Sequence, residues 1–272
     1  MNIAELLVEF SGNAPEGRAV IFKDHSITFP QLRQAVFKLA NSLKELGIKP
    51  QDKIAICLPN CLEYIYSYLA IWSIGATAVP LDFMLTEEEL VSCICHAEAK
   101  LIIARQKLGI DLSAIKEKCK GIEKIILCQE KTGNFLSFDE FLQQGSADFI
   151  AQDIPDKYYA CIFYTSGSTG KPKGVLCNYL QLSAGPKAMV HFANLNDKDI
   201  ALCALPFSHL GGLLFIQAIL FLGTTVILMD RFIPLEFLNN ILNHNITCLW
   251  LVPPMYYAIL QLKEFETFDL SS

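Results

Sequence analysis

Short apolar runs alternate with amphipathic segments along most of the chain. The runs predict strands at 53–58, 77–80, 100–104, 124–128, 159–164, 174–176, 200–205, 225–228 and 246–251. Most of these runs are continuously apolar, as is typical of strands that helices cover on both faces. The pattern therefore predicts an α/β fold with mostly parallel sheets flanked by helices.

The segments between the strands carry helix signals. A helix at 30–46 has apolar side chains at helical spacing and ends at Gly47, and Thr86 with Glu89 forms a capping box for another helix. Asn60 is expected to cap a helix that runs to 74. Further helices are predicted between 104 and 124, from 137 onward, and at 180–192, 211–222, 234–244 and 254–262.

The segment 210–229 has about twenty residues without a charge, which is the length that a membrane-spanning helix needs. Gly223 interrupts this segment, and the Thr-Thr-Val-Ile-Leu sequence that follows favours a strand. No basic cluster flanks either end. We therefore expect a buried helix followed by a buried strand, and no membrane span.

The composition and charge of the chain indicate which binding partners and which cellular compartment to expect. The 272 residues are 52% apolar, which is enough to fill the core of one large or two smaller domains. The net charge is −6 and no basic stripe is present, so nucleic acid is not an expected partner. The N-terminal segment carries Glu5 and Glu9 and lacks the basic and apolar regions of a signal peptide, so we expect a cytoplasmic protein.

Ten cysteines are scattered through apolar segments, a pattern typical of free buried thiols rather than of a disulfide scaffold. Cys93, Cys95 and His96 look like a fragment of a metal site, but no second ligand pair lies at a matching spacing. We expect these three residues to be structural, and the sequence predicts no protein ligands for a metal.

The segment 164–175 carries the clearest chemical signal. It combines glycines, hydroxyl side chains and two lysines directly after an apolar strand, where open α/β sheets bind their ligands. Backbone N–H groups at glycines converge on anions, hydroxyls add donors, and lysines supply compensating charge. A polyphosphate site is therefore predicted at Thr165, Ser166, Gly167, Ser168, Thr169, Gly170, Lys171, Lys173 and Gly174.

Two better-known phosphate motifs do not fit this segment. Pro172 stands where a kinase-type loop needs Ser or Thr after the lysine, and the glycine spacing differs from that of a dinucleotide turn. A solvated surface turn is the alternative, but the position after a buried strand favours ligand binding.

The segment 164–175 closely resembles the signature of the adenylate-forming enzymes, which include acyl-CoA synthetases, luciferases and the adenylation domains of peptide synthetases. The resemblance extends over the whole chain. Further segments similar to motifs of this family lie at 27–32, where Phe29 and Gln31 depart from the pattern, and at 75–82, 205–212 and 252–255.

The resemblance implies that ATP activates a carboxylic acid as an acyl adenylate, with release of pyrophosphate, before a thiol such as coenzyme A accepts the acyl group. It implies that Mg²⁺ arrives with the nucleotide and that the residues of the polyphosphate site hold the phosphates. It assigns His209 a catalytic role as a gate beside the reacting carboxylate. Leu210 stands where relatives that activate amino acids carry Asp, so an apolar acyl or aryl acid is favoured.

Later motifs of the family are missing from this sequence, namely Tyr-Gly-x-Thr-Glu, Thr-Gly-Asp, the hinge and the C-terminal domain with its lysine. The resemblance therefore implies that 1–272 is a truncated N-terminal domain, without the C-terminal domain. We expect two stacked flavodoxin-like subdomains, the first at about 50–180 and an incomplete second one at 1–49 plus 181–272.

The missing motifs leave two readings of the function open. The chain is part of an acid–thiol ligase, as a piece of a longer enzyme or as half of a split one whose second chain supplies the missing motifs. Alternatively, it is a non-catalytic remnant that binds ATP or phosphate. In either case we expect this chain alone not to complete adenylation.

Overall fold

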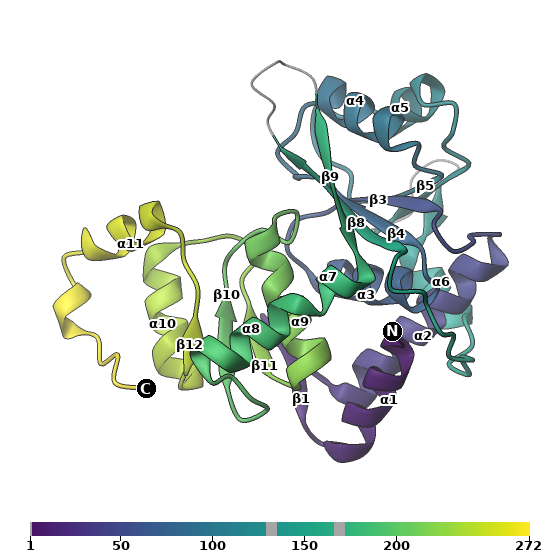
Figure 1. Ribbon diagram of the computed structural model, residues 1–272. Coiled ribbons are helices and arrows are strands. Elements are labelled where there is room, and N and C mark those ends of the chain that lie inside the picture. The colour runs from purple at the N-terminus through teal and green to yellow at the C-terminus, as the bar shows by residue number, and fades with distance from the viewer. Residues whose placement is uncertain (1, 129–134, 166–171) are drawn as a thin grey trace.

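The computed structural model describes residues 2–128, 135–165 and 172–272, and these residues form two β-sheets with helices around them (Figure 1). The larger sheet has seven strands in the order β7-β6-β5-β3-β4-β8-β9. Its central strands are parallel, whereas β8 and β9 form an antiparallel hairpin at one edge. The strand bounds are β3 Lys53–Cys57, β4 Thr77–Pro80, β5 Leu101–Ala104, β6 Lys124–Leu127, β7 Leu136–Ser137, β8 Tyr159–Thr165 and β9 Lys173–Asn178.

Helices cover both faces of this sheet. On one face, α4 (Glu87–Ala97) and α5 (Leu112–Lys118) bury an apolar cluster that includes Ala55, Ile102 and Ile125. On the other face lie α2 (Phe29–Glu45), α3 (Leu62–Ser73) and α6 (Phe138–Gln144). Alternate residues of each strand therefore supply alternate cores.

The smaller sheet has five strands in the order β12-β10-β11-β1-β2, all parallel except β2. One face packs against α10 (Pro234–His244) and α11 (Pro253–Leu260), and the other packs against α1 (Ile3–Asn13) and α9 (Leu210–Leu222). Against α9 lies α8 (Ala184–Ala193), and a 3₁₀ turn at Phe265–Thr267 follows α11. The strand bounds are β1 Arg18–Phe22, β2 His25–Thr28, β10 Ile200–Cys203, β11 Thr225–Leu228 and β12 Cys248–Leu249.

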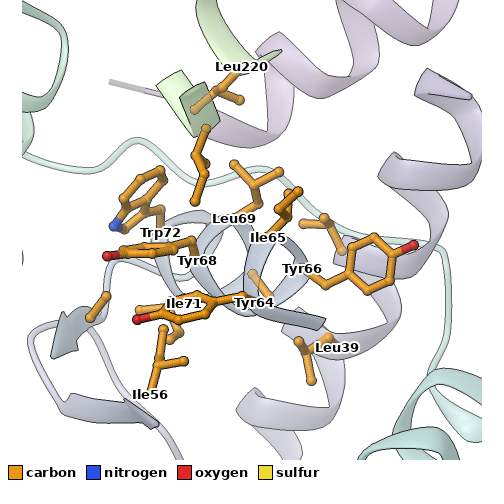
Figure 2. Packing of buried hydrophobic residues seen from close by; sticks show 14 of the residues in the cluster. Leu39, Ile56, Tyr64, Ile65, Tyr66, Tyr68, Leu69, Ile71, Trp72 and Leu220 are labelled. Carbon is orange, nitrogen blue, oxygen red and sulfur yellow. The ribbon is translucent and has the colours of Figure 1, made fainter. Parts of the chain in front are cut away.

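The two sheets share one continuous core, and α3 lies at its centre. Every residue of α3 from Tyr64 to Ser73 is buried. Figure 2 shows Tyr64, Tyr68 and Trp72 along one side of this helix, with Leu220 of α9 above it. The same apolar cluster therefore joins the larger sheet to the helices of the smaller one.

The structure confirms an α/β fold with mostly parallel sheets. It also contains elements that were not predicted, among them α1 and the hairpin of β1 and β2. The edge strand β2 is partly exposed and has one apolar residue, Ile27, so its apolar pattern is weak. Strand β1 lies between β11 and β2 and carries a short apolar run, Ala19–Phe22, which was not predicted as a strand. The helix predicted at 180–192 is wrong in its continuity, because α7 (Tyr179–Leu182) and α8 are separate helices. Pro186 in the first turn of α8 has no N–H to continue the preceding helix.

The uncharged segment 210–229 forms α9 and then β11, as predicted. Most of α9 is buried between the smaller sheet and its neighbours, which explains its apolar character on every side. Within the ranges that the structure describes, no helix has the length and the hydropathy that crossing a membrane requires.

Candidate active site

A pocket of about 570 Å³ lies where the two sheets meet. The larger sheet contributes the ends of β4 and β8 together with α4, and the smaller sheet contributes the segment before α9. Strands β4 and β8 are parallel neighbours, so their carboxyl ends open at the same edge. The lining residues are Pro80, Leu81, Asp82, Leu85, Glu88, Glu89, Ser92, Cys93, Tyr164, Thr165, Pro172, Ser208 and His209.

The hairpin of β8 and β9 holds the two ends of the predicted polyphosphate segment together. Thr165 and Lys173 are directly opposite each other in the ladder, and both are exposed. Gly174 is the next residue of β9, and a Cβ atom there would lie 2.9 Å from Cγ2 of Ile162. Glycine at this position therefore matches the close packing of the hairpin.

The other predicted phosphate residues lie outside the described part of the chain. These are Ser166, Gly167, Ser168, Thr169, Gly170 and Lys171. Their roles remain predictions, while Thr165 and Pro172 on either side of them line the pocket.

His209, the predicted catalytic residue, lies on the opposite wall of the pocket. It is the N-cap residue of α9, but its imidazole makes no capping hydrogen bond. Instead, Nε2 lies 3.1 Å from Oδ2 of Asp82, which follows β4. The hydrogen bond to Asp82 raises the pKa of His209, and the hydrogen bond to His209 lowers the pKa of Asp82. Both shifts favour an ion pair of imidazolium and carboxylate near neutral pH.

The backbone that carries His209 is fixed by Asn60, which lies in the loop between β3 and α3. The side-chain amide of Asn60 donates to the carbonyl oxygens of Leu205 (2.9 Å) and Met229 (3.2 Å). Its Oδ1 accepts a hydrogen bond from the backbone N–H of Phe207 at 2.9 Å. The hydroxyl of Tyr68 donates to the carbonyl of Phe207 at 2.9 Å. Four hydrogen bonds from the β3–α3 loop and α3 therefore hold the segment before α9 and the end of β11.

The prediction that Asn60 caps the next helix is wrong. Helix α3 begins at Leu62, its N-cap residue is Cys61, and no side chain caps it. Asn60 is 4% exposed and uses its side chain across the boundary between the sheets. Sequence reasoning missed this role because the partners lie about 150 residues away, with no local pattern to reveal them.

Tyr164 is held on the side of the pocket formed by α4. Its hydroxyl lies 2.8 Å from Nδ1 of His96, and the two rings meet edge to face. Burial raises the pKa of Tyr164 to about 12, so its hydroxyl stays protonated at neutral pH. Among the described residues, no group of three or more His, Cys, Asp or Glu side chains is arranged to hold a metal ion.

Comparison with known proteins places this geometry in context. The family model described as "AMP-binding enzyme" matches residues 8–272. A CoA ligase of Mycobacterium tuberculosis, named for a methyl-dioxo-octahydroindenyl propanoyl group, is 32% identical over 276 residues, which covers 95% of this chain and 52% of that protein. The long-chain-fatty-acid–CoA ligase of Bacillus subtilis is 27% identical over 99% of this chain and 53% of its own length. The chain thus spans about half the length of these curated relatives.

Solved structures share the fold. The anthranilate CoA ligase AuaEII in complex with anthranoyl-AMP superimposes with a TM-score of 0.90 at 22% identity, over 100% of this chain and 53% of that one. The N-terminal domain of FACL13 from Mycobacterium tuberculosis gives a TM-score of 0.89 at 23% identity, over 99% of this chain and 67% of that one. At these identities, the likeness establishes the fold alone.

Proposed function

The chain belongs to the AMP-binding enzyme family, and on that premise we propose that it provides the nucleotide-binding and acid-activating part of an AMP-forming acid–thiol ligase. In the proposed reaction, a carboxylate oxygen attacks the α-phosphorus of ATP and pyrophosphate leaves. The sulfur of a thiol such as coenzyme A then attacks the acyl carbon, and AMP leaves. Binding the reactants side by side lowers the entropic part of the barrier.

One observation carries this proposal: the ends of the polyphosphate segment and His209 share a single pocket. Lys173 and Thr165 offer a cation and a hydroxyl at the end of β8, which suits the charge of a polyphosphate. His209 lies across the same pocket, and its hydrogen bond to Asp82 raises the pKa of the imidazole and so favours the protonated ring.

Mg²⁺ enters this proposal bound to the nucleotide. The described residues hold no cluster of acidic or imidazole ligands that would keep the ion without ATP. When bound, the ion neutralises phosphate charge and polarises the phosphoryl oxygens. The residues of the chain contribute Lys173 and Thr165 as donors to the phosphate oxygens.

The proposed acid is apolar. Leu210, the first residue of α9, is 62% exposed beside His209 and offers no charge to an amino group. Relatives named for coumarate and for long-chain fatty acids agree with an aryl or acyl acid.

Titration calorimetry with ATP and Mg²⁺ tests the nucleotide site. Lys173→Ala is expected to weaken binding about tenfold, because a charge-assisted hydrogen bond contributes ~1.5 kcal/mol. Lys198→Ala is the matched control, since Lys198 lies in the turn before β10, whereas Lys173 lies in the β8–β9 hairpin opposite the pocket residue Thr165. Equal losses in the two variants would contradict the proposed role of the segment.

Exchange of labelled pyrophosphate into ATP separates the two readings of the function. We propose that this chain binds ATP without catalysing exchange, because its sequence lacks the Tyr-Gly-x-Thr-Glu and Thr-Gly-Asp motifs. Exchange that appears only after a second polypeptide is added supports a split ligase. Exchange by the purified chain alone, with an aryl or fatty acid present, would show that the missing motifs are not needed.

A further inference from the structure

The imidazole of His209 is positioned from the opposite sheet. Its own helix does not hold the ring, because the ring makes no capping hydrogen bond and the local hydrogen bonds of His209, to Pro206 and from Leu213, use its backbone. The ring contact that crosses to the larger sheet is the 3.1 Å hydrogen bond between Nε2 and Oδ2 of Asp82. The side chain of His209 is 56% exposed, so without this contact the ring would be free to change rotamer.

The carboxylate of Asp82 is itself fixed in place. Its Oδ1 accepts a hydrogen bond from the backbone N–H of Met84 at 2.8 Å, which leaves Oδ2 directed at His209. Lys107 fixes the loop that follows Asp82, because its ammonium donates to the carbonyls of Phe83 and Leu85, the latter at 2.9 Å. A preset carboxylate can orient a mobile ring at little further cost in entropy.

The other acidic groups of the pocket are differently engaged. Glu89 is tied to Thr86 by the capping box of α4, with its Oε2 accepting from the backbone N–H of Thr86 at 2.8 Å. Glu88 lines the same pocket as His209. Among the described residues, Lys107 lies close enough to Asp82 to lower its pKa, and Cys93 and Tyr164 also line the pocket. Asp82 is therefore the carboxylate whose contact with the ring is direct.

We propose that Asp82 is a positioning residue for His209, holding the imidazole by Nε2 across the boundary between the sheets so that Nδ1 remains for a reactant. The catalytic relevance of this pairing rests on the proposed function, because it assumes that His209 faces the reacting acid. The pairing itself does not depend on any nucleotide. In both charge states of the ring, Nε2 keeps its proton and donates it in the hydrogen bond to Asp82. Nδ1 is therefore the nitrogen that titrates.

The test is an NMR titration of the full chain labelled with ¹⁵N-histidine. His209→Gln identifies the signal of His209 among the five histidines. The midpoint of His209 is then followed in the wild type and in Asp82→Asn, Asp82→Glu and Glu88→Gln. Glu88→Gln is the matched control, because it removes a charge from the same pocket without breaking the pair. Urea unfolding of each variant shows whether the fold is retained.

The wild-type midpoint is expected above that of free histidine, and Asp82→Asn is expected to lower it. Asp82→Glu should restore a raised midpoint, because the carboxylate returns, and Glu88→Gln should leave it close to that of the wild type. Equal shifts in Asp82→Asn and Glu88→Gln would assign the effect to the general charge of the pocket and overturn the proposal. A wild-type midpoint at or below that of free histidine overturns it whether or not the variants fold. Either result leaves the calorimetric test of nucleotide binding unaffected, so the two proposals fail separately.

Discussion

Replacing Asn60 by alanine is expected to lower the free energy of unfolding more than replacing an exposed asparagine that makes a similar number of hydrogen bonds. The substitution removes three hydrogen bonds and leaves the carbonyl oxygens of Leu205 and Met229 and the N–H of Phe207 without this partner. Phe207 is 0% exposed, and Leu205 and Met229 are 7% and 6% exposed, so bulk water does not readily replace the amide.

The magnitude follows from the cost of leaving buried polar groups unsatisfied, which is about 1–3 kcal/mol for each group. Three groups at the lower limit give about 3 kcal/mol, and a water molecule that enters the vacated space would reduce the higher estimates. A loss of about 3 kcal/mol corresponds to roughly a 150-fold change in the ratio of folded to unfolded chain.

Asn41→Ala is the matched control. Asn41 donates two hydrogen bonds of 2.9 Å, to the carbonyls of Ser146 and Asp148, but its surroundings are partly exposed and water can replace it. Urea unfolding is followed by far-ultraviolet circular dichroism and by tryptophan fluorescence, and coincident transitions are required before free energies are compared. If Asn60→Ala costs no more than Asn41→Ala, the assigned role of Asn60 is wrong.

Three further predictions concern residues near the pocket. Tyr68→Phe should cost about 1–2 kcal/mol of unfolding free energy, because Phe207 loses a buried donor, whereas Tyr64→Phe should cost little, since the hydroxyl of Tyr64 is buried with no hydrogen-bond partner in the described structure. Gly174→Ala should destabilise by about 1–3 kcal/mol through crowding against Ile162, whereas Gly12→Ala, with open space in α1, should be neutral or stabilising; thermal unfolding compares the two. Because the pKa of His209 is raised in the folded chain, its contribution to the free energy of unfolding is complete below about pH 6.5 and is lost as pH rises through the folded pKa. Because the pKa of Asp82 is lowered, its contribution is complete above about pH 4 and is lost as pH falls through the folded pKa. The difference in unfolding free energy between wild type and Asp82→Asn should therefore be largest between about pH 4 and 6.5, and a difference that grows above pH 8 would contradict the ion pair.

The local part of the fold could be predicted because its causes are local. Strands such as β3 and β4 are buried on both faces, so their apolar runs are unbroken and easily recognised. The capping box of Thr86 and Glu89 is present as predicted, because four consecutive residues contain all of its partners. The edge strand β2 gave little signal, because it is partly exposed and has only one apolar residue.

The candidate site could be predicted only in part, for the same physical reason. The composition of the segment 164–175, which is rich in glycine, hydroxyl and lysine side chains, by itself indicates phosphate binding. The partner of His209 does not, because Asp82 lies 127 positions earlier and meets the ring only through the packing of two sheets. The resemblance to a family pointed to His209 but gave no information about what holds it.

These polar contacts also explain how one apolar core can keep two sheets in a fixed relation. Apolar packing around α3 favours contact between the sheets but is not directional, whereas the hydrogen bonds of Asn60 and Tyr68 fix one position of the segment before α9. If that segment positions His209 for Asp82, Asn60→Ala should lower the midpoint of the His209 titration although Asn60 does not touch the ring. The double variant with Asp82→Asn should then show no further decrease, because the ring has already lost its partner. Should Asn60→Ala destabilise the chain and leave the His209 midpoint at its wild-type value, Asn60 would join the sheets without positioning the site, and Asp82 alone would determine where the imidazole lies.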